Sequence, residues 1–224
     1  MTHANLFKTW ATLLTAMFIA IVLSTIVHTT GAEAQAPSCA GRVVLDPGHG
    51  GTDPGAVNKK YNLKEKEQNL DVANRLKTLL QNDGCTVYMT RTTDKALSNN
   101  DRYTYANTTG ADVLVSVHMN GSTNTSADYT TTLFGKWRKD KELATTVFGS
   151  LSTLPAAEGT GTIATRIPYS FASGVLLKSD MPAIIAETVF ITSDAEGRLL
   201  SNGTGTRQQQ IAEALKVGIE RYLG

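Results

Sequence analysis

Two short apolar runs flank a segment of helical periodicity, and this pattern limits the chain to an α/β fold. The first run, Arg42–Asp46, is bounded by Pro and Gly and is typical of a buried strand. Apolar residues at helical spacing begin near Lys64 or Glu65 and continue to a stop at Asp83 and Gly84. Thr86–Thr90 is then predicted to be the next strand. A strand, a helix and a strand within about 50 residues form a βαβ unit, in which the strands are parallel and the crossover is right-handed.

The rest of the chain repeats this alternation. Buried strands are predicted at Ala111–Val117 and Pro182–Thr188, and helices at residues 101–109, 141–151 and 207–223. Because strands alternate with helices, we predict a single α/β domain with helices on both faces of its sheet. Gly121–Thr132 and Asp194–Gly205 are predicted to be polar connections, and Pro155–Gly174 has no clear pattern.

Residues 1–36 have the composition of a secretory signal peptide. Lys8 supplies a positive start, Trp10–Val27 is apolar and almost uncharged, and Ala34-Gln35-Ala36 is a small-x-small cleavage site. Because the apolar stretch approaches the roughly 20 residues of a spanning helix, an uncleaved membrane anchor is the alternative. We therefore predict a leader over residues 1–36 and one folded domain over 37–224. The domain would be secreted to the periplasm or cell wall, or would face outward from a membrane anchor.

The charge balance excludes some classes of partner. The formal net charge is +1, so no strong field attracts nucleic acid or anionic lipid. We predict no nucleic-acid partner, contact with a membrane only if the leader is uncleaved, and a monomer.

The two cysteines, Cys39 and Cys85, each lie just before a predicted strand. If those strands are parallel neighbours, both thiols lie at the same edge of the sheet. An exported chain meets oxidising conditions, so we predict a disulfide. Two reduced thiols that only pack are the alternative.

Beyond the leader, the chain has two histidines, and each lies where an apolar run gives way to a polar turn. His49 follows the first predicted strand and His118 follows the third. Glu65 lies in the first turn of the helix after the first strand, and that helix starts at the same sheet edge. Two imidazoles and one carboxylate are typical ligands of catalytic zinc, with a fourth position open for water. We predict one Zn²⁺ per chain.

Five further polar residues have predicted roles. Glu187 interrupts an apolar strand, where desolvation raises the pKa of a carboxyl and suits it to proton transfer; a cap or salt bridge is the alternative. Asp46 either accepts a bond from a ligand histidine or forms a turn with its own backbone. Asn120 either contacts substrate or lies in a tight turn. Arg91 and Arg102 are predicted to fix loops through buried pairs.

The run Val43–Ala56, which contains Asp46-Pro47-Gly48-His49-Gly50-Gly51, resembles the opening of zinc-dependent N-acetylmuramoyl-L-alanine amidases, a family of bacterial cell-wall hydrolases. Four more segments resemble family motifs in the family's order: Glu65–Leu70, Thr90-Arg91 with Arg102, Ser116–Asn120, and Met181–Glu187. The glutamate strand departs from the family, since Thr188-Val189-Phe190 stands where a Gly-Phe pair is usual.

The resemblance implies a mixed, mostly parallel sheet of about six strands flanked by helices. It implies that His49, Glu65 and His118 hold zinc, that Glu187 is the catalytic glutamate, and that 37–224 is the zinc amidase domain. The implied reaction uses zinc-activated water to cleave the amide between the lactyl group of N-acetylmuramic acid and L-alanine of the stem peptide in peptidoglycan. Two alternatives are a zinc carboxypeptidase that trims stem peptides, with Arg166 as its carboxylate-binding cation, and an inactive wall-binding module.

Overall fold

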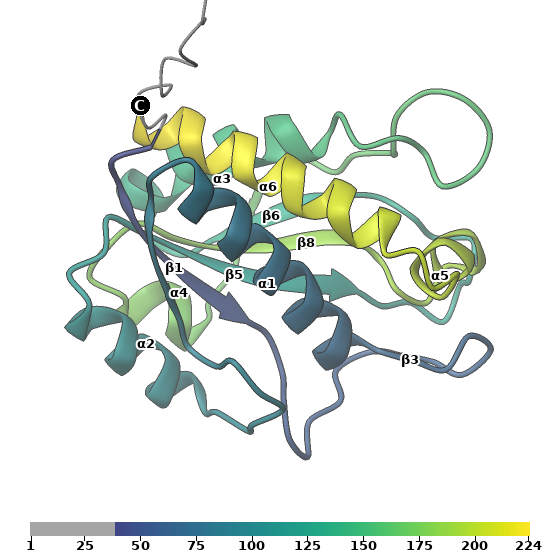
Figure 1. The fold of residues 1–224 in the computed structure, drawn as a ribbon, viewed down its shortest axis with the longest axis horizontal. Helices are drawn as coiled ribbons and strands as arrows, with labels where there is room; N and C mark the ends of the chain where they lie inside the picture. Colours follow the sequence, from purple (N-terminus) through teal and green to yellow (C-terminus); the bar gives the residue numbers. More distant parts are fainter. Residues whose placement is uncertain (1–38) are drawn as a thin grey trace, which may run out of the picture. The chain divides into compact units, whose positions relative to one another are not determined.

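The computed structural model describes residues 39–224, so the predicted leader lies outside the described part. These residues form a six-stranded sheet in the order β4-β1-β5-β8-β6-β7 and a separate two-stranded β2-β3 pair (Figure 1). The strands are β1 (Arg42–Pro47), β2 (Val57–Asn58), β3 (Leu63–Lys64), β4 (Thr86–Met89), β5 (Val113–Asn120), β6 (Thr131–Phe134), β7 (Tyr169–Ser170) and β8 (Ala183–Phe190). The helices are α1 (Glu65–Asn82), α2 (Asn99–Thr108), α3 (Trp137–Leu151), α4 (Gly174–Lys178), α5 (Asp194–Leu200) and α6 (Thr206–Leu223).

The sheet is mixed and mostly parallel, as predicted. β1 pairs in parallel with β4 and β5, and β5 pairs in parallel with β8. β6 runs antiparallel to β8 and parallel to β7. The carboxyl ends of β1, β5 and β8 therefore lie at one edge, where ligands gather in sheets of this kind.

Side chains of β5 alternate between two cores. Val113, Val115 and Val117 join the larger core, which the helices α1, α3 and α6 cover. Leu114 joins the smaller core with Ala106 of α2 and with residues of α4. Because alternate residues of a strand share a face, Ser116 and His118 lie on the α2 and α4 face of the sheet. Helices cover both faces, as predicted (Figure 1).

Two strands run further than predicted. β5 continues through Asn120, so His118, which was predicted to follow its strand, lies inside it; β8 continues through Phe190, with Glu187 inside the strand as predicted. The polar residue at each position does not end the strand, because the neighbouring strand continues the backbone hydrogen bonds past it.

Two elements lie where connections were predicted. β6 includes the last two residues of Gly121–Thr132, and α5 lies in Asp194–Gly205. Thr131 and Thr132 are fully buried, and their hydroxyls donate to the carbonyls of Ile167 and Ala144. Buried threonines need such partners, which lie far away in the sequence.

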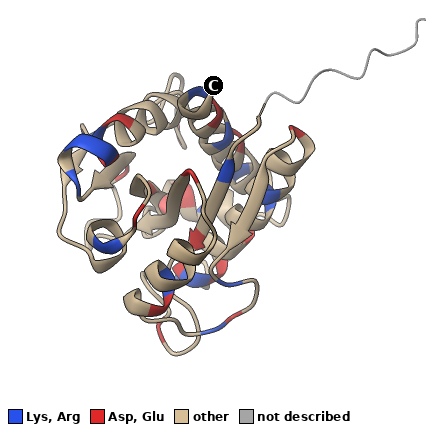
Figure 2. Ribbon diagram, turned by 90° about the vertical axis from the view of Figure 1, so that its left-hand side faces the viewer, with Lys and Arg blue, Asp and Glu red and all other residues tan. Residues whose placement is uncertain are grey.

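Basic and acidic residues are interspersed over the domain in the view of Figure 2, in line with the net charge of +1. None of the helices in residues 39–224 has the length and apolarity that a membrane crossing requires.

Cys39 and Cys85 form the predicted disulfide, with 5.0 Å between their Cα atoms. The bond joins the segment before β1 to the start of β4, and both cysteines are buried. A disulfide is typical of proteins that fold in an oxidising compartment, which agrees with export from the cytoplasm.

Removal of this disulfide is expected to destabilise the domain. The bond closes a loop over a sequence separation of 46 residues, and loop-closure entropy predicts a loss of about 4 kcal/mol in unfolding free energy for the Cys39→Ser, Cys85→Ser double variant. Denaturant unfolding measures this loss. Reductant should destabilise the wild type by the same amount and leave the double variant unchanged; an equal effect of reductant on both proteins would contradict the prediction.

Candidate metal centre

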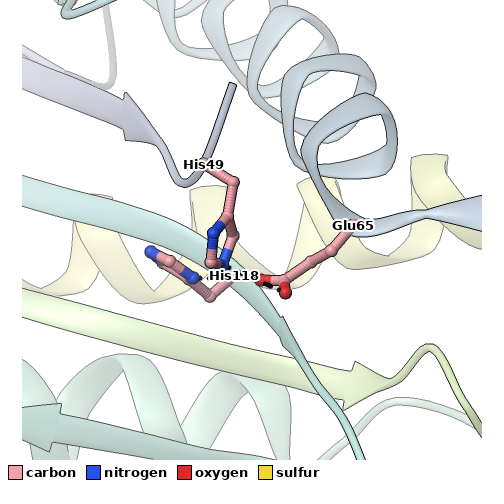
Figure 3. A group of neighbouring side chains, drawn as sticks. All are labelled: His49, Glu65 and His118. Atoms are coloured by element: carbon pink, nitrogen blue, oxygen red, sulfur yellow. Dashed lines mark hydrogen bonds and ion pairs between the residues drawn. The ribbon is translucent and has the colours of Figure 1, made fainter. Parts of the chain in front are cut away.

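His49, Glu65 and His118 converge from three elements to one point. His49 follows the end of β1, Glu65 is the first residue of α1, and His118 lies near the end of β5 (Figure 3). One ligand atom from each residue lies within 4.8 Å of the other two. The sequence therefore identified three side chains that the fold brings together.

Glu65 lies between the two imidazoles. Its Oε1 is 3.0 Å from Nδ1 of His118, and its Oε2 is 3.1 Å from Nε2 of His49. The backbone amides of Ala56 and Met119 also donate to this carboxylate, at 2.8 and 3.1 Å. Burial alone would raise the pKa of Glu65, but the hydrogen bonds with both histidines hold it well below its ordinary value. The carboxylate is thus charged and fixed in direction.

Asp53 orients the His49 ring. Nδ1 of His49 donates to Oδ2 of Asp53 at 2.8 Å, while Oδ1 of Asp53 accepts from the Gly55 amide at 3.0 Å. This leaves Nε2 directed at Glu65. Burial opposes protonation of His49, yet the hydrogen bonds with Glu65 and Asp53 raise its pKa to about 9. Bound metal competes with that proton.

Gly48 leaves room for the ring of His118. A Cβ at position 48 would lie 2.2 Å from both Cε1 and Nε2 of that ring. His49, the next residue, has a left-handed φ of 61°, which is uncommon for a non-glycine residue. The turn at Gly48 therefore lets the ring of His118 pack against the backbone that carries His49.

Gly48→Ala is therefore expected to displace His118 and weaken metal binding. We expect a loss of about 10- to 100-fold in zinc affinity, the range typical of changes in groups that support a metal ligand. Competition with a chromophoric chelator measures this affinity. Gly149→Ala is the matched control, because a Cβ there meets nothing within 4 Å; equal affinity in both variants would show that His118 does not need this space.

Two buried arginines hold the loop that carries His49. Arg102 donates to the carbonyls of Pro47 and His49, each at 2.9 Å. Arg91 donates to the carbonyls of Pro47 and Gly48, also at 2.9 Å. Both arginines thus fix the loop, as predicted, but only Arg102 does so with an ion-pair partner, which is Asp46.

Asp46 takes neither of its two predicted roles. Its carboxylate accepts from Arg102, Ser116 and Thr90, each at 2.6 Å. Among the described residues, its hydrogen bonds include none to a histidine ring and none to a neighbouring turn amide. Burial would raise the pKa of Asp46, but Arg102 and the two hydroxyls lower it. Asp46 therefore acts on His49 indirectly, by fixing Arg102. Asp46 and Arg102 are 56 positions apart, so their spacing in the sequence does not reveal this contact.

Glu187 lies beside His118 on the neighbouring strand. The two residues are in register between β5 and β8, so their side chains project from the same face of the sheet. No side chain within residues 39–224 donates a hydrogen bond to its carboxylate. Burial raises the pKa of Glu187, and the nearby His118 imidazole lowers it in part. A carboxyl in this setting is suited to take up and release a proton.

A cavity of about 210 Å³ is lined by both candidate histidine ligands, His49 and His118. Its lining also includes Ser116, Ile185, Phe171 and Val175. Phe171 is about half exposed, at 47%. The strands β1 and β5 thus supply polar groups to a partly apolar cleft, to which β8 contributes the apolar Ile185, as is usual for sites that bind organic substrates.

Asn120 is the last residue of β5, and its carbonyl accepts from the amide of Ile191 at 2.9 Å. It is a strand residue rather than a tight-turn residue. Phe171, which follows β7 on the far side of β6, lines the cavity, whereas Arg166 is bonded through its backbone amide to the carbonyl of Thr130, just before β6. Phe171 was not predicted as a site residue, because no local sequence pattern marks it.

Residues 43–221 match the family described as N-acetylmuramoyl-L-alanine amidase (Amidase_3). The chain is 32% identical over 231 aligned residues to the amidase AmiC of Escherichia coli O6:H1, in a match that covers 83% of this chain and 55% of AmiC. It is 30% identical to the amidase AmiA of Escherichia coli K12, with 80% of this chain and 75% of AmiA covered. The chain thus spans little more than half the length of AmiC.

Solved structures show the same architecture. The N-acetylmuramoyl-L-alanine amidase of Clostridium difficile 630 is 35% identical, with a TM-score of 0.74 over 82% of this chain and 97% of that one. The catalytic domain of the amidase CwlV from Paenibacillus polymyxa is 27% identical, with a TM-score of 0.71 over 82% of this chain and 98% of that domain. From its motifs, its fold and its metal-ligand cluster, the chain belongs to the N-acetylmuramoyl-L-alanine amidase family.

Proposed function

We propose that this chain is a zinc-dependent N-acetylmuramoyl-L-alanine amidase of peptidoglycan. Its substrate bond is the amide between the lactyl group of N-acetylmuramic acid and L-alanine of the stem peptide. The observation that carries the proposal is the cluster of His49, Glu65 and His118 in a member of this family, with Glu187 in register with His118 and both histidines lining a cavity.

The donor set fits zinc. Two imidazoles and one carboxylate with room for a fourth ligand are the usual arrangement in catalytic zinc sites, whereas closed structural sites use four protein ligands, mostly cysteine. Asp53 supports this assignment, because a carboxylate that accepts from the second ring nitrogen commonly orients a zinc-bound histidine. When bound, zinc would lower the pKa of a coordinated water and polarise the scissile carbonyl.

The residues of the chain account for the proton transfers. Glu187 would take a proton from the attacking water as the oxygen of that water bonds to the carbonyl carbon of the lactyl group. The same carboxyl would then donate that proton to the amide nitrogen as the carbon–nitrogen bond breaks. The products are a lactyl carboxylate on the glycan and a free amino group on L-alanine. Arg102 and Arg91 would keep His49 in place throughout.

We further propose that the protein acts as a monomer outside the cytoplasm, in the periplasm or cell wall, and that residues 1–36 are the export signal. The buried disulfide supports export.

Mass spectrometry of peptidoglycan digested by residues 37–224 tests the proposed activity. An amidase leaves lactyl-bearing glycan strands and frees stem peptides with an L-alanine amino terminus, and a chelator stops both products. A carboxypeptidase would instead release single amino acids and leave the shortened peptides attached. A wall-binding module would release nothing, so either of these results would overturn the proposal.

A further inference from the structure

Arg166 is a cation without a carboxylate partner among the described residues. Its side chain is exposed, and no Asp or Glu of residues 39–224 lies within ion-pair distance of it. Two aromatic residues hold it in place. The guanidinium donates to the hydroxyl of Tyr129 at 3.3 Å and lies 5.0 Å from the ring centre of Tyr169. An arginine oriented by neutral groups keeps its charge available for an anion.

The two tyrosines are themselves anchored. The Tyr129 ring packs edge-on against Phe190, with 4.6 Å between ring centres, and Phe190 is almost fully buried. Tyr169 is a β7 residue paired with Leu133 of β6. The position of Arg166 is thus set by the sheet rather than by a free loop.

Arg166 lies on the opposite side of Glu187 from the metal centre. Along the sheet, His118 is in register with Glu187, and Glu187 is in register with Thr131. The neighbouring Thr130 accepts at its carbonyl from the Arg166 amide at 3.0 Å. With strands about 4.8 Å apart, the Arg166 backbone is roughly 10 Å from that of Glu187. Burial raises the pKa of Tyr169, the charge of Arg166 lowers it and the charge of Glu187 raises it, so Tyr169 lies within electrostatic range of both groups.

The proposed reaction sets the direction in which the substrate lies across the strands from His118 to Arg166. The carbonyl that is attacked must lie at the metal centre, and the amine that leaves must lie at Glu187, which protonates it. L-alanine and the stem-peptide residues after it therefore extend from Glu187 toward Arg166. An extended chain advances about 3.3 Å per residue, so roughly 10 Å spans about three residues, and Arg166 then lies beside the second or third of them. Stem peptides carry free or amidated carboxyl groups at these residues.

We propose that Arg166 is a specificity residue that binds a free carboxylate on the second or third residue of the stem peptide. The inference rests on the proposed amidase function, because that reaction sets the direction of the peptide. The Tyr129 hydroxyl and the Tyr169 ring hold the guanidinium ready for this contact.

Synthetic muramoyl-tripeptides test the inference. One carries both carboxylates free, the second is amidated at residue two, and the third is amidated at residue three. We expect the wild type to prefer the free acid to one of the amides by about tenfold in kcat/KM, through KM rather than kcat. Arg166→Gln should lose this preference, and Arg166→Lys should keep part of it. Arg138→Gln on α3 is the matched control, since Arg138 is also exposed, and it should behave as the wild type.

A second readout does not depend on turnover. The released tripeptide, with and without amidation, is titrated into each protein by calorimetry. Arg166→Gln should weaken binding of the acid about tenfold and leave binding of the critical amide unchanged, and added salt should reduce the wild-type preference. Equal kcat/KM and equal binding of acid and amides by the wild type would overturn the inference while leaving the amidase function intact. An equal loss on all substrates in Arg166→Gln would also overturn it. Absence of lactyl–alanine cleavage by the wild type would instead overturn the proposed function.

Discussion

Glu187→Ala is expected to abolish hydrolysis of the lactyl–alanine amide while zinc content stays at one per chain. Glu187 lies beside His118 but outside the cluster of candidate ligands. Its loss therefore removes the proton carrier and leaves the metal ligands in place. General acid–base groups contribute about 10²- to 10⁴-fold to rate, and here one group would serve both proton transfers. Elemental analysis and single-substrate kinetics measure the two quantities.

Two further variants sharpen this prediction. Glu187→Gln keeps the shape of the side chain and should lose activity to a similar extent, because the amide cannot carry the proton. Glu213→Gln changes an exposed carboxylate on α6 and should retain full activity. Near-normal turnover in Glu187→Ala, or loss of its zinc, would contradict the assigned role.

Glu65→Ala is expected to lose both zinc and activity. Glu65 is the negatively charged member of the cluster, and two backbone amides and both histidines contact its carboxylate. Its removal should lower zinc affinity by more than about 100-fold, since even changes in groups that only support a ligand cost 10- to 100-fold. Metal competition measures the affinity, and treatment of the wild type with a chelator should reproduce the loss of activity until zinc is restored.

Glu67→Ala is the control for this variant. Glu67 is two residues further along α1, is half exposed and pairs with Lys64 at 3.2 Å. It should retain zinc and activity. If Glu67→Ala lost zinc and Glu65→Ala kept it, the ligand assignment would be wrong.

Much of the fold could be predicted from the local pattern of apolar and polar residues. The helix at Glu65 and the strands around it were predictable because buried strands and amphipathic helices differ in their apolar period. The Cys39–Cys85 bridge followed from the place of each cysteine before a parallel strand. β6 and α5 were not found, since their buried polar residues depend on partners in other elements: Thr132 donates to Ala144 of α3, and Glu196 of α5 pairs with Arg207 of α6.

The sequence by itself determined which side chains could bind metal and to which edge of the sheet they would belong, because the alternation of strands and helices and the helix starts follow from periodicity and motif. The tertiary structure alone decided how they are held. The His118 ring occupies the space that Gly48 leaves, Asp46 reaches His49 through Arg102, and Arg166 stands beyond Glu187 on the far side of β6. These contacts join residues that are distant along the chain, and close packing of whole elements, rather than any local preference, brings such residues together.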